Sequence, residues 1–285
     1  MSKPDGLKKK SILAGLASCM LLAFSAGGLA AADLAAVVSG KAGPYSAAYA
    51  AFKAALKGPH DFYDASAPDF APPEDISYAV AFGAKAAAVE YPPGTRLVYA
   101  LAPVTGRGRN WHEISMAPQP AEAIAAYRRL QPGLRRLAVF WAAYPGDIYM
   151  EELRKAGQAA GVEIISAKLK SPDSFPERLR HLMGKMDAFW LMPDPVLITQ
   201  SSLMILADFS CSNAIPFYAP TYALVIHGAT ASFAPEFPDA GAAAARAIAA
   251  IRRGDALPPV IYPEKTSLRV NEELRDKCRW PLAKK

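Results

Sequence analysis

Small and polar residues stand at the points where predicted strands give way to predicted helices. Ser39-Gly40 follows the apolar run 34–38, and Gly83-Ala84-Lys85 follows the run 77–82. Ligands of open α/β sheets bind at the carboxyl ends of parallel strands, where such turns lie. A helix that begins there also presents free N–H groups, which suit a carboxylate or another acceptor. These turns therefore predict a small-molecule binding site.

The second half of the chain offers three matching turns, at 141–147, 193–195 and 219–222. Aromatic walls for a ligand are offered there by Trp141, Tyr144, Phe217 and Tyr222. The candidate ligand-binding residues of both halves are Ser39, Gly40, Gly83, Ala84, Lys85, Trp141, Tyr144, Asp194 and Thr221. Each also has a structural explanation, as a tight turn, a helix cap, a solvated lysine or a packed ring. The binding hypothesis depends on their shared position at one edge of two sheets.

No motif in the sequence points to an enzyme. H-E-x-x-H, C-x-x-C, G-x-S-x-G and the Walker loop are all absent, and each carries its own catalytic or binding chemistry. No pair of carboxylates stands out for acid–base catalysis. None of the four histidines has the spacing of a metal ligand; they are His60, His112, His181 and His227. We therefore expect a protein without catalytic residues, a metal or a cofactor.

The elements that must position these turns alternate between strand and helix. In the first half, strands are predicted over 34–38, 60–63, 77–82 and 97–101, with helices from 45 and over 85–90. The pattern breaks at 102–120, where prolines, glycines and arginines predict a linker. In the second half, the predicted helices are 121–130, 148–160, 174–184, 201–210 and 240–253, and the predicted strands are 137–141, 162–169, 187–192, 215–218 and 229–233. Such alternation predicts the α/β class, with two doubly wound parallel-sheet lobes.

The first 32 residues have the layout of an export signal. Lys8-Lys9-Lys10 precedes the apolar run 11–29, and Ala30-Ala31-Ala32 offers an A-x-A cleavage site. A retained membrane anchor is one alternative. Another is lipidation of Cys19, because Leu16-Ala17-Ser18-Cys19 resembles a lipobox. We favour cleavage after residue 32, which predicts a periplasmic protein.

Two composition features depend on that cleavage. The chain has 285 residues and a net charge of +6. Residues 1–32 hold four lysines against one aspartate, so the exported part keeps half of that charge, and we expect no nucleic-acid partner. Only Cys211 and Cys278 remain after the cut. An oxidising compartment permits a bridge between them, but two separate buried thiols fit the sequence equally well.

Several segments resemble one family. Val38-Ser39-Gly40-x-x-Gly-Pro-Tyr45 is similar to the opening of substrate-binding proteins of ABC transporters of the tryptophan/tyrosine-binding-protein type. Val80–Ala86 resembles a further first-lobe segment, and Asp187–Pro195 resembles the family's D-A-x-W-L-x-P-D-P. Ile215-Pro216-Phe217 and Gly228–Ser232 continue the pattern in the family's order. The similarity covers nearly all of 33–275.

The resemblance implies a type I periplasmic-binding fold that closes about a hinge. The implied lobes are 33–114 with 235–256, and 115–234 with 257–285. Ser39, Gly83, Ala84 and Lys85 would line one side of the cleft, and Tyr144, Asp194 and Thr221 the other. The chain departs from the family at Gly83-Ala84-Lys85, where a small hydroxyl residue is usual, and at Pro103-Val104-Thr105, where Asp-Pro is common. These departures argue against an amino acid as the ligand and favour either a more apolar ligand or a role outside a complete ABC transporter.

Three functions follow from this reading. The first is a monomeric solute-binding protein that captures a small molecule and delivers it to a membrane permease. The second is a periplasmic carrier of a hydrophobic or lipid-like ligand on the same scaffold. The third is a sensor or docking protein that only contacts a membrane partner. A larger, apolar cleft without a charged clamp would favour the second function over the first.

Overall fold

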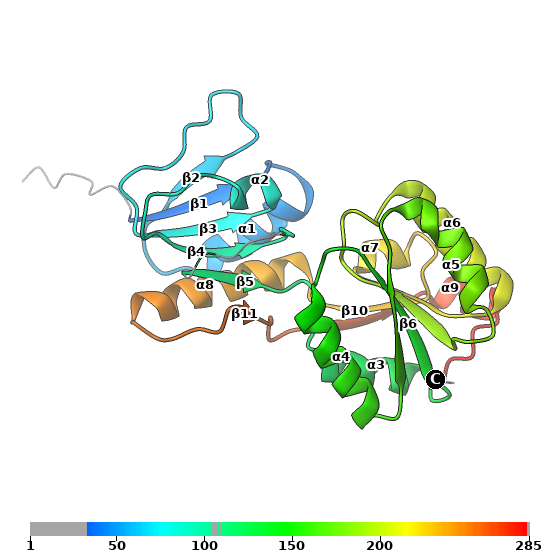
Figure 1. Ribbon diagram of the computed structural model, residues 1–285. Coiled ribbons are helices and arrows are strands. Elements are labelled where there is room, and N and C mark those ends of the chain that lie inside the picture. The colour runs from blue at the N-terminus through cyan, green and yellow to red at the C-terminus, as the bar shows by residue number, and fades with distance from the viewer. Residues whose placement is uncertain (1–32, 104–107, 109, 284–285) are drawn as a thin grey trace, which may run out of the picture. The chain divides into compact units, whose positions relative to one another are not determined.

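The computed structural model describes residues 33–103, 108 and 110–283 (Figure 1). The predicted signal peptide, with the cleavage site and Cys19, lies outside the described residues, as does most of the arginine-containing stretch 104–109. Within the described residues, no helix combines the length and the apolar character needed to cross a bilayer.

The first sheet has six parallel strands. Its order is β11-β5-β4-β3-β1-β2. The strands are β1 (Leu34–Val38), β2 (Asp61–Asp64), β3 (Tyr78–Phe82), β4 (Arg96–Ala100), β5 (Trp111–Ile114) and β11 (Val260–Ile261). Helices cover both faces of such a sheet, so its central strands are buried and read as continuous apolar runs. All five residues of β1 are buried, in agreement with that rule.

The helices of the first sheet are α1 (Gly43–Ala55), α2 (Ala84–Ala87) and α8 (Phe237–Arg252). Helices α1 and α8 pack closely against each other, because alanines and one glycine form their contact. A Cβ atom on Gly241 would lie 1.9 Å from the backbone oxygen of Ala48. Only a glycine permits this separation, so the residue fixes how near the two helices approach.

The second sheet repeats the first in strand order, β12-β10-β9-β8-β6-β7. Strand β12 pairs antiparallel with β10, and the other pairs are parallel. The strands are β6 (Arg136–Trp141), β7 (Glu163–Lys168), β8 (Ala188–Leu191), β9 (Phe217–Ala219), β10 (Ala231–Ala234) and β12 (Ser267–Val270). The surrounding helices are α3 (Pro120–Leu130), α4 (Asp147–Ala159), η1 (Pro172–Ser174), α5 (Phe175–Leu182), α6 (Gln200–Asn213), α7 (Tyr222–Val225) and α9 (Glu272–Lys277).

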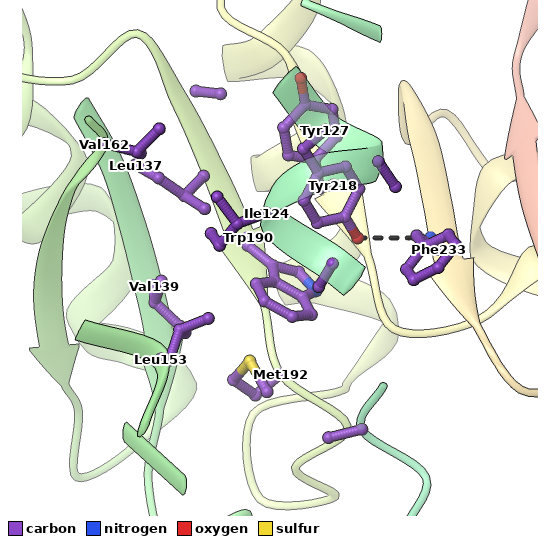
Figure 2. Close-up of a cluster of buried hydrophobic side chains, with 14 of the residues drawn as sticks. Ile124, Tyr127, Leu137, Val139, Leu153, Val162, Trp190, Met192, Tyr218 and Phe233 are labelled. Carbon is purple, nitrogen blue, oxygen red and sulfur yellow. Dashed lines mark hydrogen bonds between the residues drawn. The ribbon is translucent and has the colours of Figure 1, made fainter. Parts of the chain in front are cut away.

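Aromatic rings fill the core of the second sheet. Tyr127 stacks on Tyr218 with ring centroids 4.0 Å apart, and Trp190 meets Tyr127 edge-on at 5.2 Å (Figure 2). The Tyr127 hydroxyl accepts a hydrogen bond from the backbone N–H of Phe233, and the Tyr218 hydroxyl donates to Gln131. Buried tyrosines need such partners, and these bonds fix the rings in the core.

Type I α/β architecture is confirmed, but the region 102–120 is not simply a linker. It contains β5, a strand of the first sheet. Strands β11 and β12 and helix α9 lie after residue 253, where the sequence pattern predicts no element. Strand β11 pairs with β5, so residues 260–261 belong to the first sheet and not to the second, where the predicted boundary at 257 placed them. Strands β11 and β12 have only two and four residues, which is too short for a periodic pattern to reveal them.

The chain passes between the sheets three times. It does so between β5 and α3, between β10 and α8, and between β11 and β12. Cys211 on α6 and Cys278 after α9 form a disulfide, with Cα atoms 4.5 Å apart. This resolves the open question of the two thiols. The indole N–H of Trp280 donates to Ser210 nearby, so the C-terminal segment is attached to α6 by a covalent bond and by packing.

Candidate ligand-binding site

A cavity of about 390 Å³ lies where loops from the carboxyl ends of both sheets meet. This is the edge at which α/β sheets bind ligands. The first sheet contributes the starts of α1, α2 and α8 and the ends of β4 and β5. The second sheet contributes the loops after β6, β8 and β9. The lining residues are Pro44, Tyr45, Ala84, Leu101, Ala102, Pro103, Glu113, Ile114, Met116, Tyr144, Pro193, Pro195, Ile198, Thr221 and Phe237.

Three of the nine predicted site residues line this cavity. They are Ala84, Tyr144 and Thr221. The other six do not appear in its lining; they are Ser39, Gly40, Gly83, Lys85, Trp141 and Asp194. Their contact with a ligand stays a prediction. The surroundings of Ser39, Gly83, Asp194, Trp141 and Lys85 are described below.

Ser39 and Gly83 hold the first-sheet turns together. The Ser39 side chain is buried, and its hydroxyl accepts a hydrogen bond of 2.9 Å from the backbone N–H of Ala86 in α2. Gly83 has φ +101°, and a Cβ atom there would lie 2.5 Å from both Ser39 Oγ and a ring carbon of Tyr45. The glycine therefore lets Tyr45 and Ser39 approach the strand end, and Tyr45 takes the place on the cavity wall.

Asp194 organises the second-sheet turns from inside the protein. Its side chain is fully buried. Oxygen Oδ2 accepts hydrogen bonds from the backbone N–H groups of Ala142, Ala143 and Tyr144 at 2.7–2.9 Å, and Oδ1 accepts one from Val196 at 3.0 Å. Hydrogen bonds to an ionised acceptor are strong. The aspartate thus fixes the loop after β6, and its two flanking prolines face the cavity.

Tyr144 reaches from that loop to the end of β5. Its hydroxyl accepts a hydrogen bond of 3.2 Å from the backbone N–H of Met116 and lies 3.5 Å from the hydroxyl of Ser115. Burial raises the pKa of Tyr144, and the negative charge of Glu113 raises it further. The residue is therefore a neutral hydrogen-bonding group on the cavity wall, and its contact with a ligand stays a prediction.

Trp141 and Lys85 have other surroundings. Trp141 is only 2% exposed and belongs to the core of the second sheet. Its indole N–H donates to Ser166, and the ammonium of Lys168 lies 4.2 Å from its ring. Lys85 is exposed on α2. Phe217, the other ring proposed as a wall, is also buried in the core.

Sequence reasoning missed Leu101, Glu113 and Phe237. Glu113 lies on β5, inside the stretch that the glycines and prolines marked as a linker. Leu101 has φ +59°, a conformation that costs a non-glycine residue energy and that concentrates at functional sites. Phe237 begins α8, and its predicted helix started three residues later. Nothing in the spacing of these residues distinguishes them from packing residues.

The cavity lining is mainly apolar. Among its described residues, Glu113, Thr221 and the two tyrosines supply the polar atoms, and none is a lysine or an arginine. Pockets for small molecules combine apolar walls with a few placed polar groups in this way. The described residues hold no group of acidic, histidine and cysteine side chains arranged for a metal ion.

The family model for ABC transporter substrate-binding proteins matches residues 113–271, more than half of the chain. The chain belongs to this family. Substrate-binding proteins of this family bind small-molecule ligands, work with transporter permeases and act outside the cytoplasm. The match covers the second sheet with all of its cavity loops, and it includes Glu113 at its first position.

Solved structures of similar fold include further substrate-binding proteins. One, from Streptococcus pneumonia and in complex with L-Trp, is 16% identical with a TM-score of 0.59, over 87% of this chain and 95% of the other. Another, a ligand-free, open substrate-binding protein with adhesive properties from Clostridium difficile, is 15% identical with a TM-score of 0.61, over 87% and 94%. A conserved domain protein from Vibrio cholerae is 14% identical with a TM-score of 0.58, over 88% and 95%. Among curated proteins, none matches the chain. At these identities the structures establish the fold of this substrate-binding protein and not its ligand.

Proposed function

We propose that this substrate-binding protein captures a small apolar molecule in the cavity and delivers it to a membrane permease from the periplasm. The observation that carries the proposal is the lining of the cavity by strand-end loops of both sheets. A ligand held by both sets of loops favours the arrangement in which they close on it. The three chain crossings form the hinge. The protein acts as a monomer and catalyses no reaction.

The walls support an apolar ligand rather than an amino acid or a sugar. Leu101, Ile114, Met116, Ile198 and Phe237 present hydrocarbon to the cavity. A sugar needs many hydrogen-bonding partners, and a free carboxylate is best held by a cation or by several N–H groups. A low density of polar groups therefore agrees with the more apolar ligand, which is one of the two alternatives that the sequence departures favour.

A carrier of a hydrophobic or lipid-like ligand is the second candidate function. A neighbouring cavity of about 300 Å³ shares Thr221 and Phe237 with the first, and its walls include Tyr222, Ile226 and Pro238. For this function we propose that the apolar tail of the ligand extends past Thr221 and Phe237 into the neighbouring cavity. A test with ligands of increasing chain length separates this function from uptake of a compact molecule.

The binding site is tested by filling the cavity. Ala84 is exposed at the start of α2 and lines the cavity, while its neighbour Lys85 is exposed but does not line it. Ala84→Trp places an indole in the part of the cavity where the ligand would lie. Because Ala84 is exposed, this substitution leaves the core intact. Lys85→Trp adds the same ring one position away and is the matched control.

The measurement is ligand binding by the full chain, followed through the stabilisation that a ligand causes. The compounds tested are those that native mass spectrometry finds bound to the protein, together with a panel of amines, amino acids, sugars, anions and lipids. Ligand at 100 times its Kd stabilises the wild-type protein by about 2.7 kcal/mol. We expect Ala84→Trp to weaken binding more than tenfold and Lys85→Trp to leave it within about twofold. Equal loss in both variants would include Lys85 in the site, as the sequence predicts. Full binding by Ala84→Trp would contradict the proposed cavity.

A further inference from the structure

The neighbouring cavity of about 300 Å³, called here the α7 cavity, has a floor formed by β10 and β12. These strands pair antiparallel, with Ser232 opposite Arg269 and Ala234 opposite Ser267. Directly opposed residues of antiparallel strands project to the same face of a sheet, so these four side chains share one face. Phe233, which lies between Ser232 and Ala234, points into the core on the other face. The register of the two strands therefore sets the floor of the α7 cavity.

The walls of the α7 cavity are apolar. Tyr222 and Ile226 on α7 form one wall, and Phe237 and Pro238 at the start of α8 form another. Tyr222 is 50% exposed and Ile226 is 66% exposed, although both are large hydrophobic residues. Removal of such hydrocarbon from water favours binding. An apolar ligand body in the α7 cavity would therefore be stabilised by contact with these two side chains.

Three hydroxyl groups in this lining have no hydrogen-bond partner among the described residues. They belong to Thr221, Ser232 and Ser267. Ser232 is only 1% exposed, and a buried hydroxyl without a partner costs free energy. Among the described side chains, only Trp190 has a polar atom that is both fully enclosed and unpaired, so the Ser232 hydroxyl still reaches open space, which the α7 cavity provides. A ligand with a hydroxyl or carbonyl group would supply the missing partner.

The charged side chains of the lining compensate each other. Arg269 donates to Glu236 at 3.0 Å, and its guanidinium carbon lies 5.6 Å from the ring centre of Tyr222. Among the described lining residues, Arg269 and Glu236 are the charged ones. A charged ligand would have to compete with this ion pair for a partner, whereas an uncharged ligand leaves the pair intact.

We infer that the α7 cavity is a second ligand site, for a small uncharged molecule that joins an apolar body to a hydroxyl or carbonyl group. The body lies against Ile226 and Phe237, and the polar group forms a hydrogen bond with Ser232. This site goes beyond the proposed function, because the α7 cavity shares only Thr221 and Phe237 with the candidate ligand-binding site. The two cavities therefore hold separate molecules.

Four compounds built on one aromatic ring test the inference on the full chain by ligand-observed NMR titration. 2-Phenylethanol carries a hydroxyl, ethylbenzene no polar group, phenylacetate a negative charge and 2-phenylethylamine a positive charge. One hydrogen bond changes an affinity by about fivefold, so we expect 2-phenylethanol to bind about fivefold more tightly than ethylbenzene. The two ions should bind more weakly than 2-phenylethanol. Equal or tighter binding of ethylbenzene or of either ion overturns the ligand class.

Two filling variants locate the bound compound. Ala223 is exposed on α7 and lines the α7 cavity alone, so Ala223→Trp places an indole in that cavity. Ala84→Trp fills the candidate ligand-binding site and is the matched control. We expect Ala223→Trp to weaken binding of 2-phenylethanol more than tenfold and Ala84→Trp to change it less than twofold. Loss in Ala84→Trp alone overturns the second site. Loss in both variants shows that one ligand occupies both cavities, which overturns it as well.

Ser232→Ala tests the polar contact. Because the hydroxyl has no described partner in the protein, this variant should keep the wild-type urea midpoint. The preference for 2-phenylethanol over ethylbenzene should fall to within about twofold. A preference that survives unchanged overturns the role of Ser232. The wild-type series and the filling variants remain decisive where Ser232→Ala does not fold.

Failure of this inference and failure of the proposed function give different results. Absence of 2-phenylethanol binding at millimolar concentration overturns the second site alone. A compound of the wider panel that Ala84→Trp blocks and Ala223→Trp leaves bound supports the proposed function, whatever the outcome for 2-phenylethanol.

Discussion

The two sheets have the same strand order but fill their cores with residues of different size. The first sheet buries mostly alanine and valine, and its helices α1 and α8 meet through alanines. The second sheet buries two tryptophans, Trp141 and Trp190, together with tyrosines and phenylalanines. Protein interiors reach a similar density in either case. The same topology therefore accommodates small or large core residues, provided that the spacing of the helices changes with the size of those residues.

The turns that line the cavity also differ between the two sheets, in the number of hydrogen bonds that hold them. In the first sheet, the hydroxyl of Ser39 holds α2 by a single hydrogen bond to Ala86. In the second sheet, the carboxylate of Asp194 collects four backbone N–H groups. The second set of loops is therefore more strongly constrained, and we expect it to act as the fixed wall of the cavity.

The largest effect should come from truncating matched core residues. Trp190 and Val80 occupy the third positions of β8 and β3, the corresponding strands of the two sheets. Trp190→Ala should lower the free energy of unfolding by about 4 kcal/mol and Val80→Ala by about 2 kcal/mol, because cost rises with the volume removed. Urea unfolding measures both. Equal losses would show that core size does not distinguish the sheets.

Removal of the turn residues should follow in size. Asp194→Ala leaves four backbone N–H groups without their acceptor, which should cost about 3 kcal/mol. Ser39→Ala removes one bond and should cost about 1 kcal/mol. The sequence places Asp194 among the candidate ligand-binding residues, but its four buried hydrogen bonds favour a larger effect of Asp194→Ala on stability than on binding. A loss of binding without a change in urea midpoint would instead indicate that Asp194 contacts the ligand.

Gly241→Ala tests the close packing of α1 and α8. The new methyl group would overlap Ala48, and overpacking of this kind costs up to about 3 kcal/mol, less about 1 kcal/mol gained in helix propensity. We expect a net loss of about 2 kcal/mol by thermal unfolding. Gly133→Ala, where a Cβ meets nothing within 4 Å, is the control and should change little.

The smallest effect concerns pH. Asp187 directly precedes β8 in the second sheet. Ser77 holds the corresponding position in the first sheet, directly before β3. Burial raises the pKa of Asp187, but hydrogen bonds from Arg136 and from the backbone of Arg135 and Arg136 outweigh burial and lower it. A carboxyl with a lowered folded pKa stabilises above its unfolded value near 3.9 and loses that contribution as pH falls through the folded value.

Asp187→Asn should therefore reduce stability at pH 7 by more than it does at pH 3. Urea unfolding of both proteins at the two pH values measures this difference. Ser77→Ala, the corresponding change in the first sheet, should show no such pH dependence. A constant difference between wild type and Asp187→Asn would contradict the assignment of a lowered pKa.

Much of the fold followed from the sequence. Continuous apolar runs and helical periods predicted β1, β3, β6, β8 and their neighbours, because buried parallel strands must be apolar on both faces. The short strands β5, β11 and β12 were missed, since they are formed by pairing with neighbours and not by their own composition. The order of segments also carried the family resemblance that the family model confirms.

The sequence by itself determined the fold class, the family and the strand ends at which a ligand site is expected, because these depend on local patterns along the chain. Only the tertiary structure decided which side chains at those ends reach the cavity. It placed Ala84, Tyr144 and Thr221 in the wall, buried Asp194 behind it and brought Glu113 into it. A side chain's direction depends on the packing of segments far apart in sequence, which no local spacing encodes.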